Sequence, residues 1–265
     1  MNEIITLGVD IGSTASKCVL MKNGNEIIGE EVVFIGAGTE GPMTAFNNVC
    51  KKANINKDDI VFIVATGYGR NTFETADDQI SELSCHAKGG TFLFPNVKTI
   101  IDIGGQDAKV LKVDPNGKMT SFLMNDKCAA GTGRFLEVMA RVLNIPLENF
   151  TEMALASTKK IEISSTCTVF AETEVISYLA KAVKREDILA AVHRSIASRV
   201  GNLARRAGVE EDCILTGGVA HDKGIVQALE EYLGIKIQTS KYCQVNGAIG
   251  AALYGYQIYF KEKGL

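Results

Sequence analysis

Two stretches of the chain repeat one order of apolar and polar positions. The first is LGVDIGSTASKCVLMKNGNEIIGEEVVF, near the N-terminus, and the second is IIDIGGQDAKVLKVDPNGKMTSFLM, nearer the middle. When Asp10 is aligned with Asp102, Lys17 falls on Lys109, and an Asn-Gly pair follows at nearly the same distance. Alternating apolar positions, interrupted by a glycine turn and an Asn-Gly turn, are typical of a three-stranded meander. The sequence therefore predicts two copies of one strand–turn–strand–hairpin–strand unit.

Each copy is followed by a helical pattern and then by a further strand. Apolar residues recur at the helical period in PMTAFNNVCKKA after the first copy and in GRFLEVMARVLN after the second. Strand-like runs return in DIVFIVATGYGR and DCILTGGVAHDKG. This order predicts an α/β fold with two duplicated domains, each a mixed sheet with helices on its faces. We place the first domain at residues 1–95 and the second at 96–246, and expect the final helix, 247–265, to cross back onto the first.

Composition narrows the class of protein. The 265 residues carry a formal net charge of −3 at pH 7, so the chain lacks the basic footprint of a nucleic-acid-binding protein. No apolar run approaches the roughly 18 residues of a membrane span, and the N-terminus does not resemble a secretory signal. We therefore expect a cytoplasmic protein whose seven cysteines are reduced thiols.

The glycine turns indicate that the protein binds nucleotide phosphates. Backbone N–H groups left uncovered by glycine bind phosphate oxygens, and the hydroxyls of Ser13 and Thr14 and the ammonium of Lys17 add further donors. Asp10 and Asp102, at the strand ends, are suited to Mg²⁺ held through water. A third glycine signal, LTGGVAHDKG, follows a strand and opens a helix, a position suited to the nucleoside or α-phosphate. The sequence has no GxxxxGK[ST], which excludes a P-loop NTPase.

At this point the motifs resemble a known superfamily. DIGSTASKC, DIGGQDAKV and LTGGVA look like the phosphate-1, phosphate-2 and adenosine motifs of the actin/hexokinase/Hsp70-like ATPases. The runs MNDKCAAGTGRFLEVMA, ISSTCTVFAETEVIS and NGAIGAALYGY closely resemble the ATP-dependent activators (component A) of (R)-2-hydroxyacyl-CoA dehydratases, of the BadF/BadG/BcrA/BcrD type. They resemble the ATPase subunits of benzoyl-CoA reductase less closely. The resemblance covers essentially the whole chain.

The resemblance implies two ribonuclease-H-like, actin-like ATPase domains around a nucleotide cleft. It also implies a homodimer that hydrolyses Mg-ATP, takes one electron from ferredoxin or flavodoxin, and passes it to a dehydratase of anaerobic amino-acid fermentation. The implied phosphate-binding residues are Gly12, Ser13, Thr14, Ala15, Ser16, Lys17, Gly104, Gly105 and Gln106. The residues that would serve magnesium or the attacking water are Asp10, Asp102, Asp107 and Gln106. The adenosine side would be bound by Gly217, Gly218 and Gln244.

Cys128 and Cys167 are candidate cluster ligands. Each precedes a predicted helix, one over 130–144 and one through FAETEVISYLAKA, for which Thr166 and Thr168 are candidate N-caps. A cubane iron–sulfur cluster takes four thiolates, and a twofold dimer would supply two from each chain. The residues alone leave open whether these are ligands or packing cysteines. The resemblance implies ligands of one [4Fe–4S] cluster that bridges the homodimer.

Other residues have a simpler interpretation, and two rival functions remain open. Packing roles are expected for Cys18, Cys50, Cys213 and for Cys85 beside His86. Cys243, near the nucleotide end, is expected to be incidental, and His193 is expected on a helix surface. An N-acetylhexosamine-type kinase would use an aspartate base but would not need paired cysteines ahead of helices. A chaperone-like or regulatory ATPase would need a substrate-binding domain, for which the chain shows no additional segment.

Overall fold

The computed structural model describes residues 3–164 and 167–264, which form two compact units. Unit 1 comprises the chain up to Val97, the segment Val113–Thr120, and the segment from Gln244 onward. Unit 2 comprises Lys98–Lys112 and Ser121–Cys243. Within the described residues, no helix combines the length and the apolar character that crossing a membrane requires.

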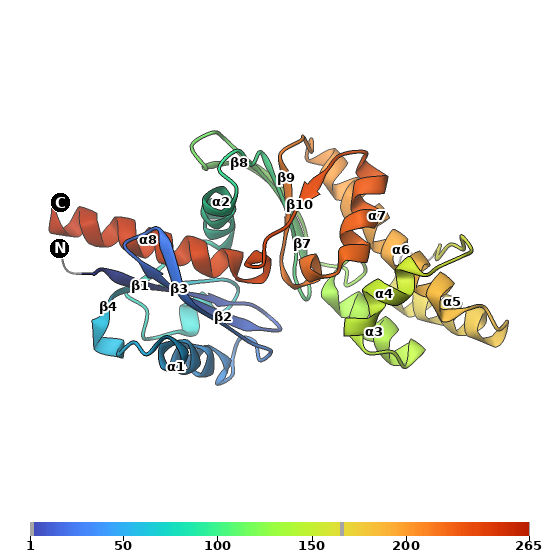
Figure 1. Ribbon diagram of the computed structural model, residues 1–265, viewed down its shortest axis with the longest axis horizontal. Helices are drawn as coiled ribbons and strands as arrows, with labels where there is room; N and C mark the ends of the chain where they lie inside the picture. Colours follow the sequence, from blue (N-terminus) through green and yellow to red (C-terminus); the bar gives the residue numbers. More distant parts are fainter. Residues whose placement is uncertain (1–2, 165–166, 265) are drawn as a thin grey trace. The chain divides into compact units, whose positions relative to one another are not determined.

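Unit 1 is built on a mixed five-stranded sheet in the order β3-β2-β1-β4-β5 (Figure 1). Its strands are β1 (Ile5–Ile11), β2 (Ser16–Lys22), β3 (Glu26–Val33), β4 (Ile60–Thr66) and β5 (Asp78–Gln79). The meander β1–β2–β3 is antiparallel, and β4 joins β1 in parallel. Every residue of β1 is buried, as expected for a strand covered on both faces.

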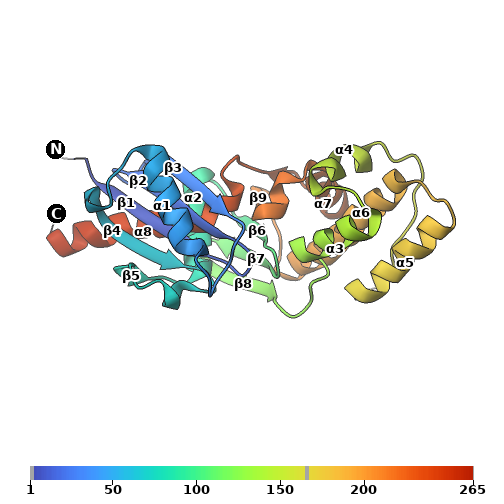
Figure 2. The same ribbon diagram turned by 90° about the horizontal axis from the view of Figure 1, so that it is seen from below.

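Helices cover both faces of this sheet. On one face α1 (Gly41–Ala53) packs against alternate apolar residues of β1, Leu7 and Val9 among them. On the other face lie α2 (Glu82–Leu93) and α8 (Asn246–Lys263), the last helix of the chain. Figures 1 and 2 show α1 and α8 on opposite sides of the strands. The C-terminal helix thus completes the core around the N-terminal strand.

Unit 2 repeats the same connectivity. Its sheet has the order β10-β9-β6-β7-β8, in which β6 pairs antiparallel with β7 and parallel with β9. The strands are β6 (Thr99–Ile103), β7 (Ala108–Val113), β8 (Met119–Asn125), β9 (Cys213–Thr216) and β10 (Ile237–Gln238). The helices are α3 (Gly133–Leu143), α4 (Phe150–Leu155), α5 (Thr168–Ala180), α6 (Arg185–Arg206) and α7 (Lys223–Leu233). The predicted α/β fold of duplicated, actin-like domains is confirmed.

Three local predictions need correction. The helix predicted over 130–144 begins at Gly133, because residues 129–132 form a turn and Thr132 is the N-cap. Cys167 is itself the N-cap of α5, so Thr168 is the first helical residue; Thr166 lies outside the described residues. His193 is only 2% exposed, not on the surface, because it lies on the side of α6 that packs against the unit 2 core.

The contact between β1 and α8 predicts a large effect of a small substitution. A Cβ atom on Gly8 would lie 1.9 Å from the carbonyl oxygen of Ala248, which is backbone and cannot turn aside. We expect Gly8→Ala to lower the free energy of unfolding by about 2–3 kcal/mol. Gly29→Ala is the matched control, because its Cβ would meet side-chain atoms alone, the nearest being the Ala53 methyl at 3.2 Å and Val49 Cγ2 at 3.3 Å. Urea unfolding measures both, and equal effects of the two variants would contradict the packing described.

Candidate functional site: two aspartate–lysine turns and two exposed thiols

The first glycine turn closes on a buried ion pair. Asp10 is the last but one residue of β1 and stands directly opposite Lys17 of β2 in the antiparallel register. The Lys17 ammonium lies 3.0 Å from Asp10 Oδ2, and the Gly12 N–H donates to the Ala15 carbonyl at 3.0 Å. The pairing offsets the cost of burying the carboxylate, which is 3% exposed. The turn thus places an oriented carboxylate and a cation side by side, next to the backbone hydrogen bond that closes it.

The second turn has the same construction with more partners. Asp102 stands opposite Lys109 in the register of β6 and β7, and the Gly104 N–H donates to the Asp107 carbonyl at 2.9 Å. The Lys109 ammonium lies 2.9 Å from Asp107 Oδ2 and 3.6 Å from Asp102 Oδ2. The hydroxyl of Thr216, on β9, donates to Asp102 Oδ1 at 2.7 Å. Both buried aspartates are therefore held in fixed orientations.

The predicted phosphate-binding residues differ in how they face solvent. Ser13 and Gln106 are exposed, and Gly12, Thr14, Lys17, Gly104 and Gly105 are partly exposed. Ala15 and Ser16 are buried, and the Ser16 hydroxyl donates to the Ile35 carbonyl at 2.8 Å. The serine hydroxyl that faces solvent in the first turn therefore belongs to Ser13.

The predicted adenosine residues lie in two different units. Gly217 follows β9 in unit 2, and its N–H donates to the Cys243 carbonyl at 2.9 Å. Gly218 is exposed and opens a short 3₁₀ helix that ends at His221. Gln244 is partly exposed and belongs to unit 1. Within unit 2, the structure gathers Gly217 and Gly218 at the end of the strand adjacent to β6.

His193, which was expected to be exposed, supports the helix after this glycine pair. Its Nε2 lies 3.0 Å from Oδ2 of Asp222, the N-cap of α7. The other oxygen of Asp222 accepts from the Thr151 hydroxyl at 2.7 Å and from the Gly224 N–H at 2.9 Å. Burial raises the pKa of Asp222. The interactions with His193, Thr151 and Gly224 lower it by more, so the pKa of Asp222 lies below its usual value. His193 therefore has a structural role.

The two candidate cluster ligands are the exposed cysteines of the chain. Cys128 and Cys167 are exposed, whereas the five other cysteines are buried. Burial raises the pKa of Cys85 and of Cys213 to about 12, which disfavours the thiolate form in both. Contrary to the sequence-based expectation, only Cys167 stands at a helix end; Cys128 precedes the N-cap of α3 by four residues.

One arginine of α6 connects the two cysteine segments. Burial lowers the pKa of Arg199, while charge interactions with Cys128 and Cys167 oppose that shift. A Cβ atom on Gly131, three residues after Cys128, would lie 3.3 Å from Arg199 Cβ, so the loop rests on this side chain. Arg199 also lines a cavity of about 250 Å³ beneath the loop, together with Asn125 and Ala130. The arginine is therefore a common neighbour of both thiols.

The Cys128 loop is also bonded directly to the second glycine turn. The Gly133 N–H donates to the Gly104 carbonyl at 2.9 Å, and the Arg134 N–H donates to the Gly105 carbonyl at 2.8 Å. The first turn of α3 thus takes its position from two residues of the predicted phosphate site. A displacement of that turn would reach the cysteine segment through backbone hydrogen bonds alone.

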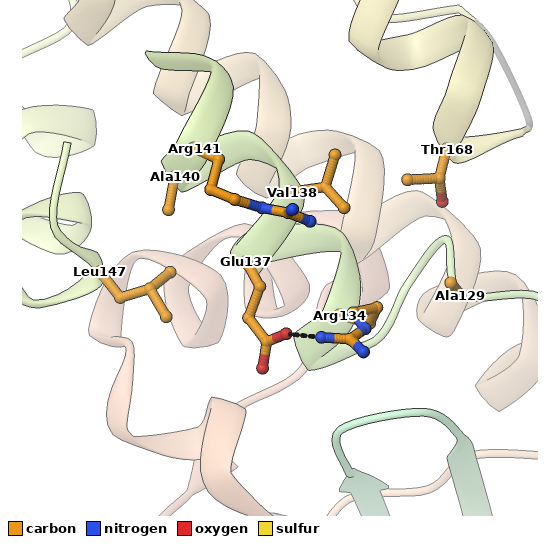
Figure 3. A pocket seen from close by; sticks show the side chains of 8 residues that line it. All are labelled: Ala129, Arg134, Glu137, Val138, Ala140, Arg141, Leu147 and Thr168. Atoms are coloured by element: carbon orange, nitrogen blue, oxygen red, sulfur yellow. Dashed lines mark hydrogen bonds and ion pairs between the residues drawn. The ribbon is translucent and has the colours of Figure 1, made fainter. Parts of the chain in front are cut away.

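A pocket of about 650 Å³ borders both cysteine segments (Figure 3). Ala129, next to Cys128, and Thr168, next to Cys167, line it with α3 residues that include the ion pair Arg134–Glu137 at 2.6 Å. In the described part of the chain, no group of three or more Asp, Glu, His or Cys side chains is placed to hold a metal ion. A single chain therefore offers at most a pair of thiols here.

Side chains of two helices hold the segment that leads to Cys167 by hydrogen bonds. Asp187 of α6 accepts hydrogen bonds from the Ser157 hydroxyl and from the N–H groups of the next two residues, at 2.8–2.9 Å. Arg194 donates to the Ile161 carbonyl at 2.9 Å. Glu174 of α5 accepts from the backbone and hydroxyl of Ser164 at 2.9 and 2.8 Å. These contacts hold the chain up to three residues before the thiol.

Sequence reasoning missed Lys109, Thr216 and Arg199 as parts of these sites. The internal repeat contained the signal for Lys109, because it falls on Lys17 in the alignment of the copies. Thr216 is brought to Asp102 by parallel strand pairing, which joins positions more than 100 residues apart. Arg199 lies in an arginine-rich helix, and nothing in that pattern distinguishes the arginines that pack against the protein from those that face solvent.

Comparisons with known proteins agree with this geometry. The sequence model of the family described as the BadF/BadG/BcrA/BcrD ATPase family matches residues 7–255. The (R)-2-hydroxyglutaryl-CoA dehydratase activating ATPase of Acidaminococcus fermentans is 56% identical over 256 residues, which cover 96% of this chain and 98% of that protein.

Two solved structures show how far the similarity extends. The activator of the 2-hydroxyisocaproyl-CoA dehydratase from Clostridium difficile, solved with bound ADPNP, has a TM-score of 0.96 at 48% identity, covering 98% of this chain and 97% of that one. A ROK family glucokinase from Streptomyces griseus has a TM-score of 0.59 at 15% identity, covering 96% of this chain and 99% of that one. The glucokinase shares the fold alone.

The Asp187 anchor predicts an acid-sensitive segment. Hydrogen bonds, led by that from the Lys159 N–H, hold the pKa of Asp187 below its usual value. The unfolded chain therefore binds the proton more readily, and the stabilisation by Asp187 is lost as the pH falls from about 4 through the folded-state pKa. Urea midpoints between pH 7 and 3 should fall less steeply for Asp187→Asn than for the wild type. Parallel curves would contradict this role.

Proposed function

Because the chain belongs to the BadF/BadG/BcrA/BcrD ATPase family, we propose that it is an ATP-hydrolysing activator of a 2-hydroxyacyl-CoA dehydratase. The observation that carries the proposal is the duplicated turn with its buried aspartate–lysine pair, Asp10–Lys17 and Asp102–Lys109. Two separate turns of this kind supply cations and backbone N–H groups for a polyphosphate and carboxylates for a hydrated Mg²⁺. The relatives named above act on different 2-hydroxyacyl-CoA dehydratases, which supports the partner class and leaves the acyl group open.

Each predicted residue takes a role that its position allows. Ser13, Thr14, Gly12 and Lys17 of the first turn, and Gly104, Gly105 and Gln106 of the second, face solvent at least in part and bind phosphate oxygens. Ala15 and Ser16 contribute as buried supports of the first turn. Gly217 and Gly218, with Gln244, bind the adenosine side. Asp10 and Asp102 orient Mg²⁺ through water, and Asp107 and Gln106 position the attacking water.

Nucleotide state is transmitted within unit 2 by the bonds between the second turn and α3. In this proposal, loss of the γ-phosphate removes an anion from beside the Gly104–Gly105 turn. The carbonyls of the same two glycines hold the Gly133 and Arg134 N–H groups, so a change in the turn moves the start of α3. The Cys128 loop ends at that point. This hydrogen-bonded junction is the contiguous path along which such coupling would pass.

The thiol pair fits half of an iron–sulfur site. Cys128 and Cys167 are exposed, share Arg199 as a neighbour, and stand on segments that are fixed by hydrogen bonds. Four thiolates hold a [4Fe–4S] cluster, so two chains related by a twofold axis would complete the set. When bound, the cluster would supply a one-electron carrier. The partners proposed are therefore a second copy of the chain, ferredoxin or flavodoxin as donor, and a 2-hydroxyacyl-CoA dehydratase as acceptor.

ATP hydrolysis tests the first part of the proposal. We expect Asp102→Asn to lower kcat about 100-fold, because the amide keeps the shape of the side chain and removes the charge that orients Mg²⁺. Asp58→Asn, at an exposed aspartate of unit 1, is the control and should leave kcat unchanged. Phosphate release under anaerobic conditions is the measurement. A wild-type protein that phosphorylates amino sugars and releases no phosphate from ATP alone would support the rival kinase.

Iron content tests the second part. We expect the anaerobically purified wild type to be a brown dimer with about four iron atoms per dimer. Cys128→Ala and Cys167→Ala should each abolish the colour and the iron, whereas Cys50→Ala, at a buried position of α1, should keep both. Iron and sulfide assays, with sedimentation to determine the oligomeric state, give the result. Iron retained in both exposed-cysteine variants would refute the ligand assignment.

A further inference from the structure

The two duplicated aspartates differ in the side chain that contacts them besides the lysine. Asp10 stands beside Thr66 on β4, as Asp102 stands beside Thr216 on β9, at the same place in the parallel register. The Thr216 hydroxyl donates to Asp102, but the Thr66 hydroxyl donates to the Ile80 carbonyl at 2.9 Å. In unit 1 the threonine hydroxyl therefore bonds to another group. A second donor to Asp10, besides Lys17, would have to come from another side chain.

His86 of α2 lies near the same carboxylate. A Cβ atom placed on Gly247 would lie 3.0 Å from Asp10 Oδ2 and 3.1 Å from His86 Nε2, so both atoms converge on one point. Two polar atoms about 3 Å from a common point are close enough for one water molecule to bridge them. The absence of a side chain on Gly247 leaves this space open. His86 is itself 5% exposed, so its ring cannot turn toward bulk water.

Asn246 determines which nitrogen of His86 carries the proton. Asn246 Nδ2 lies 3.0 Å from the His86 carbonyl oxygen and 3.3 Å from His86 Nδ1. A carbonyl only accepts hydrogen bonds, so the atom that faces it must be the amide nitrogen. The second hydrogen of that nitrogen faces Nδ1, which is then an acceptor. The neutral ring therefore carries its proton on Nε2, the atom directed at the space beside Asp10.

We propose that Asn246, His86 and Asp10 form a relay in which His86 is a positioning residue for the Asp10 carboxylate during ATP hydrolysis. The proposal rests on the proposed function, since Asp10 is there assigned to Mg²⁺. Lys17 and His86 together fix both the charge and the plane of the carboxylate, so that it orients the hydrated metal without rotating. Glu82, on the same helix with Oε1 3.8 Å from Nε2, is the competing acceptor for the Nε2 proton.

The ring tautomer can be measured directly in the intact protein. Long-range ¹H–¹⁵N spectra of histidine-labelled wild type should show His86 as the Nε2–H tautomer, assigned by the signal missing in His86→Gln. Only three histidines contribute signals, which makes the assignment simple. An Nδ1–H tautomer in the wild type would overturn the relay. This readout does not depend on ATP hydrolysis, on iron or on the dehydratase.

Hydrolysis kinetics test what the relay does. His86→Leu should lower kcat about 10- to 100-fold and raise the Mg²⁺ concentration at half-maximal rate, with the KM for ATP changed less than about threefold. His86→Gln, whose amide nitrogen can replace Nε2 as donor, should recover most of the rate. Glu82→Gln weakens the competing acceptor and should therefore keep at least the wild-type rate.

The outcomes separate the relay from the proposed function. Wild-type rates in a folded His86→Leu variant, or an equal loss in Glu82→Gln, would overturn the positioning role while ATP hydrolysis stands. A wild-type protein that does not hydrolyse ATP would refute the proposed function, and the tautomer measurement would still test the Asn246–His86 contact. If His86→Leu does not fold, the rate of His86→Gln and the wild-type tautomer decide the question.

Discussion

The site in each unit depends on one buried ion pair between an aspartate at the end of a strand and the lysine opposite it. A buried carboxylate without a partner would cost several kcal/mol, so each aspartate requires its lysine. Strand register alone brings the two together, at Asp10–Lys17 and Asp102–Lys109. A slip of one residue would reverse the faces of the strand and separate the charges. The ion pair therefore forms only in this strand register, and the register thus determines which charges the site presents.

The two units surround this pair differently, although their strand connectivity is the same. In unit 2 the adjacent parallel strand supplies Thr216, and Asp107 of the turn shares Lys109. In unit 1 the support comes from helices: α2 brings His86, and α8 brings Asn246 and Gly247 from the end of the chain. The close approach of α8 to β1 at Gly8 is what places these residues at the strand end. The C-terminal helix thus contributes both to the core and to the surroundings of Asp10.

The sequence was sufficient to predict the fold because the information was local and repeated. Strand alternation, glycine turns and Asn-Gly hairpins each lie within a few residues, and two copies support one another. The aspartates and exposed cysteines were also predictable as candidates, since their residue types and neighbours limit their chemistry. Thr216, His86 and Asn246 were not, because strand pairing and helix packing bring them to the aspartates from distant positions. His193 was misjudged for the same reason: its partner, Asp222, lies 29 positions further along the chain.

Of the two exposed thiols, Cys128 is the one whose loop is tied to the second turn by the backbone, and under the proposed function this limits how ATP can act on the pair. Side-chain contacts can be lost or replaced one at a time, whereas the Gly133 and Arg134 N–H groups have the turn carbonyls as their partners at the start of α3. A turn that changes shape must move α3 or break those bonds. Cys167 stands on a different helix, and the hydrogen bonds of Asp187, Arg194 and Glu174 anchor the segment before it at Ser157–Lys159, Ile161 and Ser164. Nucleotide-driven motion would therefore act first on Cys128, with Cys167 as the fixed reference and Arg199 beside both.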